Sequence, residues 1–483
     1  MQAAAILRIL GLLLMLFSAA LIPPILVSLW YRDGALYAFI DALLLILSSG
    51  FLLWLPVRNH RRELRLRDGF LVVALFWTVL GLTGAVPLML ALHPHMSFTD
   101  AVFESFSGLT TTGATVITGI DRLPHSILFY RQELQWLGGM GIIVLAVAVL
   151  PMLGIGGMQL FRAEAPGPVK DNKLTPRITE TAKALWVLYL GLTIACALGY
   201  WQAGMSGFDA IAHSFSTVAI GGFSTHDASI GHFRNPAIEF VAIVFMFLSG
   251  INFALHFLAW RQLSLRPYLQ DSEFRAYVLV LFGVGIATVG YLLLTETYER
   301  PYDAFHHGLF QVVSIGTTTG FTTTSYHAWP GFLPVLLLFL SFVGGCAGST
   351  GGGMKVIRFL LLIKQGMREI ARLVHPSAQI PVKVNRQPVS DRIIDAVWGF
   401  FATYVASFVL MMLLLMATGL DQVTAFSAVA ACINNLGPGL GEVALHYRDI
   451  NDAAKWVLTF AMLLGRLEIF TLLVLLSPVF WRR

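Results

Sequence analysis

The sequence predicts an all-α polytopic membrane protein with four pseudo-symmetric repeats around a central pore, each a span, a pore helix and a second span, plus two additional N-terminal transmembrane helices. The first observation is composition: hydrophobic residues make up 57% of the 483 residues, charged residues only 12%, and the mean hydropathy is +0.74. A soluble domain carries about twice that charged fraction. The second is that apolar runs of about 20 residues, enough to cross a bilayer, recur along the chain. The third is a set of four uncharged stretches that end at glycine between such runs.

Ten apolar spans are expected along the chain. They lie near residues 6–30, 36–57, 70–92, 132–155, 184–204, 236–260, 276–295, 332–363, 396–418 and 455–479. The apolar run of the first is longer than the hydrophobic core of a signal peptide, so we interpret it as a retained helix. The longest polar stretch, roughly residues 364–392, is too short for a soluble domain.

The lysines and arginines orient these spans, because cytoplasmic loops carry the excess of both residues. With the N-terminus inside, 24 of them fall in inside segments, 7 outside and one, Arg466, within a span. We therefore expect both termini in the cytoplasm. The net charge of +5 reflects this topology, and nothing in the sequence indicates nucleic-acid binding. The three cysteines show neither metal-ligand spacing nor a disulfide framework.

Four stretches between spans share one pattern. They begin "FTDAVFESFSGLTTTG" at Phe98, "GFDAIAHSFSTVAIGG" at Gly207, "PYDAFHHGLFQVVSIGTTTG" at Pro301 and "LDQVTAFSAVAACINNLG" at Leu420. Each opens near an aspartate, continues through a short, moderately apolar segment and ends at a glycine. Internal repeats of this kind define architecture. The expected organisation is 1–69 for the two extra helices, then pore repeats at 70–160, 161–262, 263–380 and 381–483.

Irregular backbone is tolerated inside a bilayer only where it is buried in protein or lines a water-filled cavity. Four uncharged breaks around one axis would offer rings of carbonyl oxygens, which can replace the hydration shell of a cation. Asp100, Asp209, Asp303 and Asp421 are expected to cap the short helices, whose negative C-terminal ends would then point at the cation. The spacing from aspartate to glycine predicts about one extra turn in the last two repeats.

The chain resembles the TrkH proteins of the Trk/Ktr/HKT potassium-transporter family over essentially its full length. The residues that carry the resemblance are "SGLTTTGAT", "AIGGFSTHD", "TTTGFTTT", "GGCAGSTGGGMKVIR", "NNLGPGLG" and "GRLEIFTLL". The resemblance implies a filter of backbone carbonyls at Thr111, Thr112, Gly113, Ile220, Gly221, Gly222, Thr318, Thr319, Gly320, Asn435, Leu436 and Gly437. The fourth segment departs from the threonine-rich pattern through Asn434 and Asn435, which suggests looser selectivity.

The same resemblance implies potassium uptake across the bacterial inner membrane. It also implies a homodimer and a cytoplasmic nucleotide-binding regulator, TrkA. Potassium would be the transported ion, and no covalent cofactor is expected.

A glycine-rich loop and a charged residue are expected to gate this pore. The stretch "GGCAGSTGGGMK" interrupts the 332–363 span, and its spacing does not match a phosphate-binding loop. Either it is a tightly packed kink, or it is an intramembrane gate, which the resemblance favours. Its candidate residues are Gly344, Gly345, Gly348, Ser349, Thr350, Gly351, Gly352 and Gly353. Arg466 lies mid-span, where a charge costs about 2.5–3.5 kcal/mol, so it either pairs with another helix or faces the pore.

Three alternatives to a potassium pore remain. Small residues are common where transmembrane helices pack, although four stretches in register favour a pore. A proton- or sodium-coupled carrier would also contain broken helices, but usually in two inverted halves. A membrane enzyme would need a nucleophile, a base or a metal cluster within the spans, and the sequence offers none that is convincing.

Overall fold

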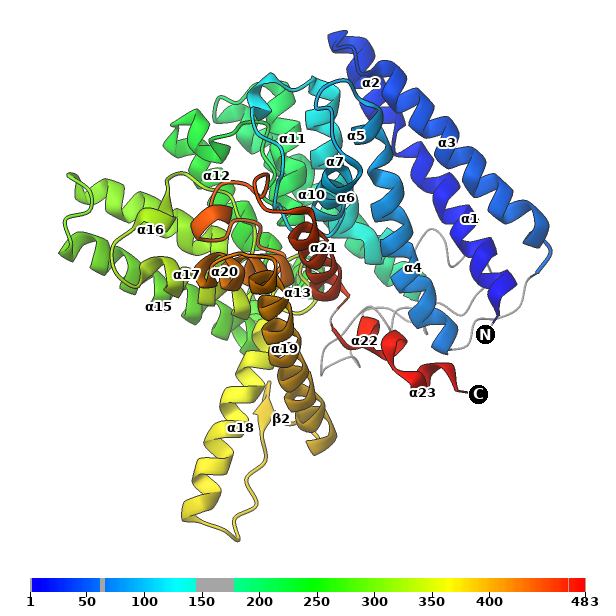
Figure 1. Cartoon of the computed structure of the whole chain (residues 1–483). Helices are drawn as coiled ribbons and strands as arrows, with labels where there is room; N and C mark the ends of the chain where they lie inside the picture. Colours follow the sequence, from blue (N-terminus) through cyan, green and yellow to red (C-terminus); the bar gives the residue numbers. More distant parts are fainter. Residues whose placement is uncertain (1, 61–65, 145–177, 468, 483) are drawn as a thin grey trace.

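The computed structural model describes residues 2–60, 66–144, 178–467 and 469–482 (Figure 1). Some of the lysines and arginines that are expected in cytoplasmic segments, at residues 61–65 and 162–177, are not among the described residues. The first span consists of α1 (Ala3–Ala19) and α2 (Ile22–Tyr31), and the second of α3 (Leu36–Trp54) with a short 3-10 turn, η1 (Leu55–Val57).

The remaining helices follow the expected order of span, short helix and second span. The first group is α4 (Leu66–Gly84), α5 (Val86–Leu90), α6 (Phe98–Leu109), η2 (Ile120–Arg122) and α7 (His125–Val144). The second is α10 (Ile178–Gln202), α11 (Gly207–Ala219), η4 (Ser229–Phe233), α12 (Pro236–Ser249) and α13 (Phe253–Gln262). The third is α14 (Arg266–Gln270), α15 (Ser272–Leu294), α16 (Pro301–Gly316), η5 (Tyr326–Ala328), α17 (Leu333–Val343) and α18 (Val356–Val374). The fourth is α19 (Asp391–Ala417), α20 (Gln422–Ile433), η6 (Gly441–Val443), α21 (Asp452–Arg466), α22 (Phe470–Leu476) and α23 (Pro478–Trp481).

Of the ten expected spans, not all correspond to one continuous described helix. Six are long and apolar enough to cross a membrane, or up to eight if two bent pairs each count as one span. The 236–260 span bends by 94° between α12 and α13, and the 455–479 span bends by 117° between α21 and α22. The 332–363 span is broken between α17 and α18, as expected, and the second half of the 132–155 span lies outside the described residues.

The bend after α12 has a local cause. Gly250 ends α12, and the side chain of Asn252 then accepts a hydrogen bond from Ala254 N at 2.8 Å as the N-cap of α13. A terminating glycine followed by a capping asparagine stops one helix and starts another even inside an apolar run. Hydropathy alone does not detect such a break.

The aspartates of the short helices do not all cap them. Ser97 caps α6 and Ser206 caps α11, while Asp100 and Asp209 lie three residues further on and accept a hydrogen bond from the capping serine. Asp421 is a true N-cap, with Val423 N and Thr424 N donating to it. The expected extra turn is therefore present in α16, which has 16 residues, and absent from α20, which has 12.

The number of residues from the N-cap of the short helix to the glycine is the same in three of the four segments and larger in the third. The separation is 16 residues for Ser97 to Gly113, Ser206 to Gly222 and Asp421 to Gly437, and 20 for Arg300 to Gly320. In the third repeat His307 therefore occupies the position held by Asp100 and Asp209, and Asp303 belongs to the additional turn.

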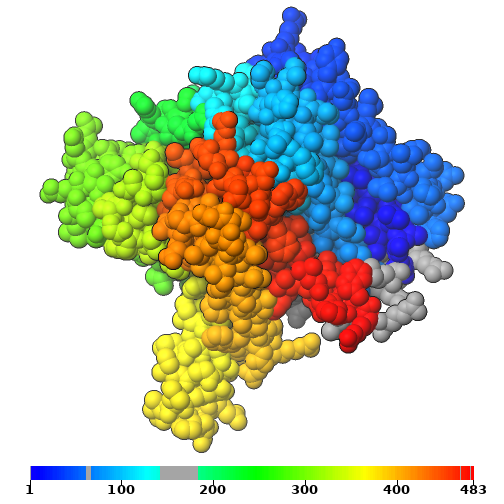
Figure 2. Space-filling view, in the orientation of Figure 1, coloured from blue at the N-terminus to red at the C-terminus, as the bar shows by residue number. Residues whose placement is uncertain are grey.

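The polar stretch near 364–392 forms a projection of its own. α18 and the start of α19 extend away from the helical body, and the projection is visible as the yellow part of the space-filling view (Figures 1 and 2). Two short antiparallel strands, β1 (Lys383–Val384) and β2 (Gln387–Pro388), join them. A small apolar cluster stabilises the unit: Ile357, Leu361, Val382, Val384, Ile394 and Val397.

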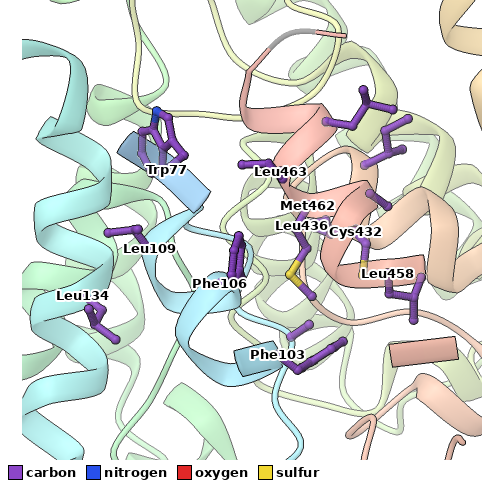
Figure 3. Close-up of a cluster of buried hydrophobic side chains, with 14 of the residues drawn as sticks. Trp77, Phe103, Phe106, Leu109, Leu134, Cys432, Leu436, Leu458, Met462 and Leu463 are labelled. Atoms are coloured by element: carbon purple, nitrogen blue, oxygen red, sulfur yellow. The ribbon is translucent and has the colours of Figure 1, made fainter. Parts of the chain in front are cut away.

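The main core brings the first and fourth groups of helices together. Figure 3 shows Phe103 and Phe106 of α6 near Met462 of α21, whereas Leu109 lies on the other side of α6, near Leu134 of α7. A partly buried ion pair joins the same two helices, with Lys455 Nζ 2.7 Å from Asp100 Oδ1. Lys455 itself is buried and makes an interhelical contact.

The two N-terminal helices pack through small residues. A Cβ atom on Gly50 would lie 2.8 Å from Gly11 O, and one on Gly11 would lie 2.7 Å from Gly50 O. Close backbone approach of this kind is a common basis for helix association in membranes. The contact fixes α1 against α3.

Gly50→Val should therefore separate α1 from α3 and destabilise the protein by about 1–3 kcal/mol, the usual cost of overpacking. Unfolding of the purified protein in micelles would measure this. Gly283→Val is the matched control, because Gly283 also lies in a span and a Cβ atom added there would meet no atom within 4 Å. Equal stability of the two variants would contradict the proposed contact.

Candidate functional site: four glycine-ended segments and the loop beneath them

All four short helices end in the same hydrogen-bonded turn. The residue after the last turn has a left-handed backbone: Thr111 (φ 56°), Ile220 (φ 55°), Thr318 (φ 69°) and Asn435 (φ 53°). The next amide then bonds back across that turn: Thr112 N to Ser107 O at 2.8 Å, Gly221 N to Ser216 O at 2.8 Å, Thr319 N to Ser314 O at 2.8 Å and Leu436 N to Ala431 O at 2.7 Å. This is the Schellman motif, in which glycine usually supplies the left-handed residue.

In each turn the left-handed residue stands two residues before the glycine and carries a side chain. A left-handed conformation costs of order 1–3 kcal/mol for such a residue, and β-branched threonine and isoleucine are unusual there. The four glycines are left-handed as well, with φ of 80°, 80°, 82° and 97° for Gly113, Gly222, Gly320 and Gly437. The sequence analysis named both the glycines and these four residues, but it did not predict the left-handed conformation of the four residues.

Each glycine approaches a backbone carbonyl of the next segment, and the fourth returns to the first. A Cβ atom would lie less than 3.0 Å from that oxygen in every case: on Gly113 from Gly221 O, on Gly222 from Thr319 O, on Gly320 from Leu436 O and on Gly437 from Thr112 O. Any side chain at these positions would push the segments apart. The twelve residues named from the sequence therefore form one closed ring of four backbone segments.

The asparagines of the fourth segment connect this ring to its surroundings. Asn435 Nδ2 donates to Thr112 Oγ1 at 2.9 Å in the first segment and to Met462 O at 3.0 Å in α21. Asn434 Oδ1 accepts from Tyr404 Oη at 2.5 Å, and Asn434 Nδ2 donates to Ser341 Oγ at 3.0 Å. The two asparagines that interrupt the threonine-rich pattern therefore form side-chain hydrogen bonds between the fourth segment and its neighbours.

Polar side chains behind the segments position them, and the sequence analysis did not find these residues. Glu104 and Arg131 form an ion pair of 2.8 Å, each 1% exposed. Glu104 accepts from Val116 N at 3.0 Å, and Arg131 Nη1 donates to Ser224 O at 3.2 Å. The pair therefore joins the chain just after the first glycine to the chain just after the second.

Gln135 holds the second segment from the same helix as Arg131. Its Nε2 donates to Gly221 O at 2.6 Å, and its Oε1 accepts from Ser216 Oγ at 2.6 Å and Phe223 N at 3.1 Å. In the fourth segment Tyr447 Oη donates to Gly437 O at 2.7 Å. The signal that could have found these residues is the polar run "RQELQ" at the start of a span, since buried polar residues in spans are costly.

The loop of residues 344–355 lies directly against the ends of the short helices. Gly352 N donates to Thr318 Oγ1 at 2.7 Å and Gly353 N donates to Asn434 O at 3.0 Å. Thr350 Oγ1 donates to Val218 O at 2.9 Å, at the end of α11. The loop residues named from the sequence therefore contact the second, third and fourth segments.

Arg466 joins the loop to the first segment. Its Nη1 lies 3.3 Å from Thr111 Oγ1 and 3.5 Å from Thr350 O, and its Nη2 donates to Gly138 O at 2.5 Å. Its guanidinium carbon also lies 5.4 Å from the centre of the Trp77 ring. The two gate candidates named from the sequence are thus in direct contact.

A titratable cluster lies beyond the second glycine, outside the spans. His226 Nδ1 lies 2.6 Å from Asp121 Oδ1, and its Nε2 lies 3.7 Å from Asp209 Oδ1. Burial alone would lower the pKa of His226, but its hydrogen bonds and charge interactions with Asp209 and Asp121 raise it above its usual value. This ion pair connects the outer loops of the first two segments.

The chain matches characterised proteins over its full length. The family described as "TrkH: Cation transport protein" matches residues 36–482. The Trk system potassium uptake protein TrkH of Vibrio parahaemolyticus is 62% identical, and that of Escherichia coli strain K12 is 56% identical, with 100% of each chain covered. The crystal structure of the potassium transporter TrkH from Vibrio parahaemolyticus superposes with a TM-score of 0.91 at 59% identity, covering 100% of both chains.

Glu104→Gln should destabilise the protein by about 3–5 kcal/mol, because it leaves the Arg131 charge buried without its partner. Thermal unfolding in lipid nanodiscs would measure the loss. Glu369→Gln is the control: the Glu369 side chain is 51% exposed and pairs with the exposed Arg372, and the neighbouring Arg368 keeps Asp391 as a partner. Surface ion pairs contribute about 0–1 kcal/mol. Similar losses in both variants would contradict the structural role of the buried pair.

Proposed function

The chain belongs to the TrkH family of cation transport proteins, and from this premise we propose that it takes up potassium ions through a pore formed by its four glycine-ended segments. The observation that supports this proposal most directly is the closed ring of glycine-to-carbonyl contacts. A ring of this kind presents uncharged backbone oxygens, which can replace the hydration shell of potassium. The C-terminal ends of the four short helices add a negative potential that favours a cation.

In this proposal the filter consists of the twelve residues at 111–113, 220–222, 318–320 and 435–437. The four repeats at 70–160, 161–262, 263–380 and 381–483 are related by pseudo-symmetry. The cap-to-glycine spacing that three of them share and the Schellman turns of all four support that relation. The Asn435 contact with Thr112 makes the ring asymmetric, which would reduce its preference for potassium over sodium.

The proposed gate is the 344–353 loop together with Arg466. The loop is hydrogen bonded to the ends of three segments, and Arg466 bonds to both the loop and Thr111. A fixed positive charge next to the pathway would repel potassium, and loop glycines can adopt alternative backbone states.

We place the protein in the bacterial inner membrane with both termini in the cytoplasm. The contact of Arg67 Nη1 with Arg482 O, 2.8 Å, puts the C-terminus at the start of α4, close to the N-terminus (Figure 1). The projecting α18–α19 unit would then face the cytoplasm and be the docking surface for a nucleotide-binding regulator of the TrkA type. Arg372 is exposed there, whereas Arg368 bonds to Asp391 and contributes to the fold. Assembly as a homodimer is part of the same proposal.

A coupled carrier is the alternative function, because the 94° bend between α12 and α13 is the kind of discontinuous helix that carriers use. Flux into liposomes with the potassium and pH gradients varied independently separates the two. A passive pore follows the potassium gradient alone. A coupled carrier moves potassium against its gradient when protons or sodium flow.

Gly113→Ser and Gly320→Ser should lower the ratio of potassium to sodium uptake, because each side chain would displace a neighbouring carbonyl. Uptake of both ions would be measured in a strain that lacks other potassium uptake. Gly119→Ser is the matched control, since Gly119 is also left-handed (φ 73°) but a Cβ atom added there would meet no atom within 4 Å. Unchanged ratios in both filter variants would remove these glycines from the filter.

Arg466→Ala and Arg466→Gln should raise potassium flux, most clearly without a regulator, whereas Arg466→Lys should not. Two unit charges about 6 Å apart repel by roughly 3 kcal/mol at an effective dielectric near 20, which is about a hundredfold in occupancy. Flux per folded molecule in liposomes would test this. If Arg466 only holds the fold together, the neutral variants will instead lose stability and flux. Lower flux from stable Arg466→Gln protein would therefore overturn the barrier role.

A further inference from the structure

Three side chains that could ligate one metal ion lie between α12 and α16. One ligand atom from each of Glu239, His306 and His307 lies within 4.8 Å of the other two. We infer that Glu239, His306 and His307 form a binding site for a divalent transition-metal ion such as Zn²⁺. This site is separate from the proposed potassium pathway and does not depend on it.

The carboxylate is the first reason for this inference. Glu239 is 4% exposed, and its Oε2 accepts no hydrogen bond from any residue that the structure describes. The same oxygen lies 3.3 Å from His306 Nε2. A buried carboxylate oxygen without a hydrogen bond is costly to keep charged, so the group either becomes protonated or takes a cationic partner, a metal ion or a protonated histidine.

The arrangement of the two imidazole rings favours a metal ion as the partner of Glu239. A zinc–nitrogen bond of about 2.0–2.1 Å puts an imidazole centre about 3.2 Å from the metal, so two rings at the tetrahedral angle have centres about 5.2 Å apart. The rings of His306 and His307 have centres 5.4 Å apart and planes tilted by 57°. Their separation therefore already corresponds to two ligands of one ion.

The surroundings of the rings also fit metal ligation. His307 Nδ1 lies 3.0 Å from Thr323 Oγ1, so a ring that donates there keeps a lone pair on Nε2 for a metal. The ring of His306 is stacked on Tyr302, with centres 5.5 Å apart and planes 11° apart. Hydrogen bonds and packing of this kind orient ligating histidines in known metal sites. Two histidines and one carboxylate suit zinc and neighbouring transition metals better than Mg²⁺ or Ca²⁺.

A similar group at Asp121, His226 and His232 has a less suitable geometry. The rings of His226 and His232 are stacked face to face, with centres 3.5 Å apart and planes 2° apart. The lone pairs of parallel rings lie in parallel planes, so they do not converge on one ion unless a ring rotates. We therefore assign the metal to the site between α12 and α16, where it would tie the two helices together next to Thr323.

Zinc binding to the purified full chain tests this assignment. The protein in lipid nanodiscs, stripped with a chelator, would be titrated with Zn²⁺ against a chromophoric zinc indicator. A His226→Ala background removes the competing group. We expect one Zn²⁺ per chain, with affinity reduced at least tenfold by Glu239→Gln, His306→Ala or His307→Ala. His327→Ala, a histidine outside both groups, should leave the affinity unchanged.

Melting temperature provides a second, independent readout. Zn²⁺ should raise the melting temperature of the parent protein and of His327→Ala, because a ligand that binds the folded state stabilises it. It should not raise that of Glu239→Gln, which is nearly isosteric and remains informative if the histidine variants fold poorly. Undetectable Zn²⁺ binding, or binding that Glu239→Gln leaves unchanged, would overturn the assignment.

Discussion

The structure depends on how four helices can end inside an apolar interior. The last turn of any helix leaves its carbonyl groups without intrahelical partners, and lipid cannot donate hydrogen bonds to them. The Schellman turn at Thr111 and its three equivalents solves this locally, because two amides bond back to the final helical turn. The left-handed residue then redirects the chain toward the next segment. The ring of glycine-to-carbonyl contacts follows from that geometry, and the strain of the left-handed residues is held by their neighbours.

The four segments share a backbone but differ in what supports it. Buried side chains of α7 hold the first two segments through the Glu104–Arg131 pair and Gln135. In the fourth segment, Asn435 bonds directly to Thr112 of the first segment. The third contacts the glycine loop through Thr318. A common backbone therefore does not make the segments energetically equivalent, and their environments can be tuned separately.

The sequence analysis could single out the four glycine-ended stretches because the same uncharged pattern ending at glycine recurs between apolar runs. It did not predict the left-handed threonines and Ile220, because nothing in their residue type favours that conformation. The caps were misassigned for a related reason. Aspartate is common both at the N-cap and three residues later, and Ser97 and Ser206 are the actual caps. Gln135 and Arg131 were missed because their partners are distant in sequence, which periodicity cannot reveal.

The contacts of the glycine loop connect the proposed gate to the proposed filter. Gly353 N donates to the carbonyl of Asn434, and Thr350 Oγ1 donates to the carbonyl of Val218, both at helix ends. If the loop moves aside, these carbonyls lose their partners at a cost of about 1–3 kcal/mol each unless another donor or a cation replaces them. Water or an entering potassium ion could fill that role. Opening would then be favoured by occupancy of the pathway, and Arg466, bonded to both Thr350 and Thr111, would have to exchange its partners in the same step.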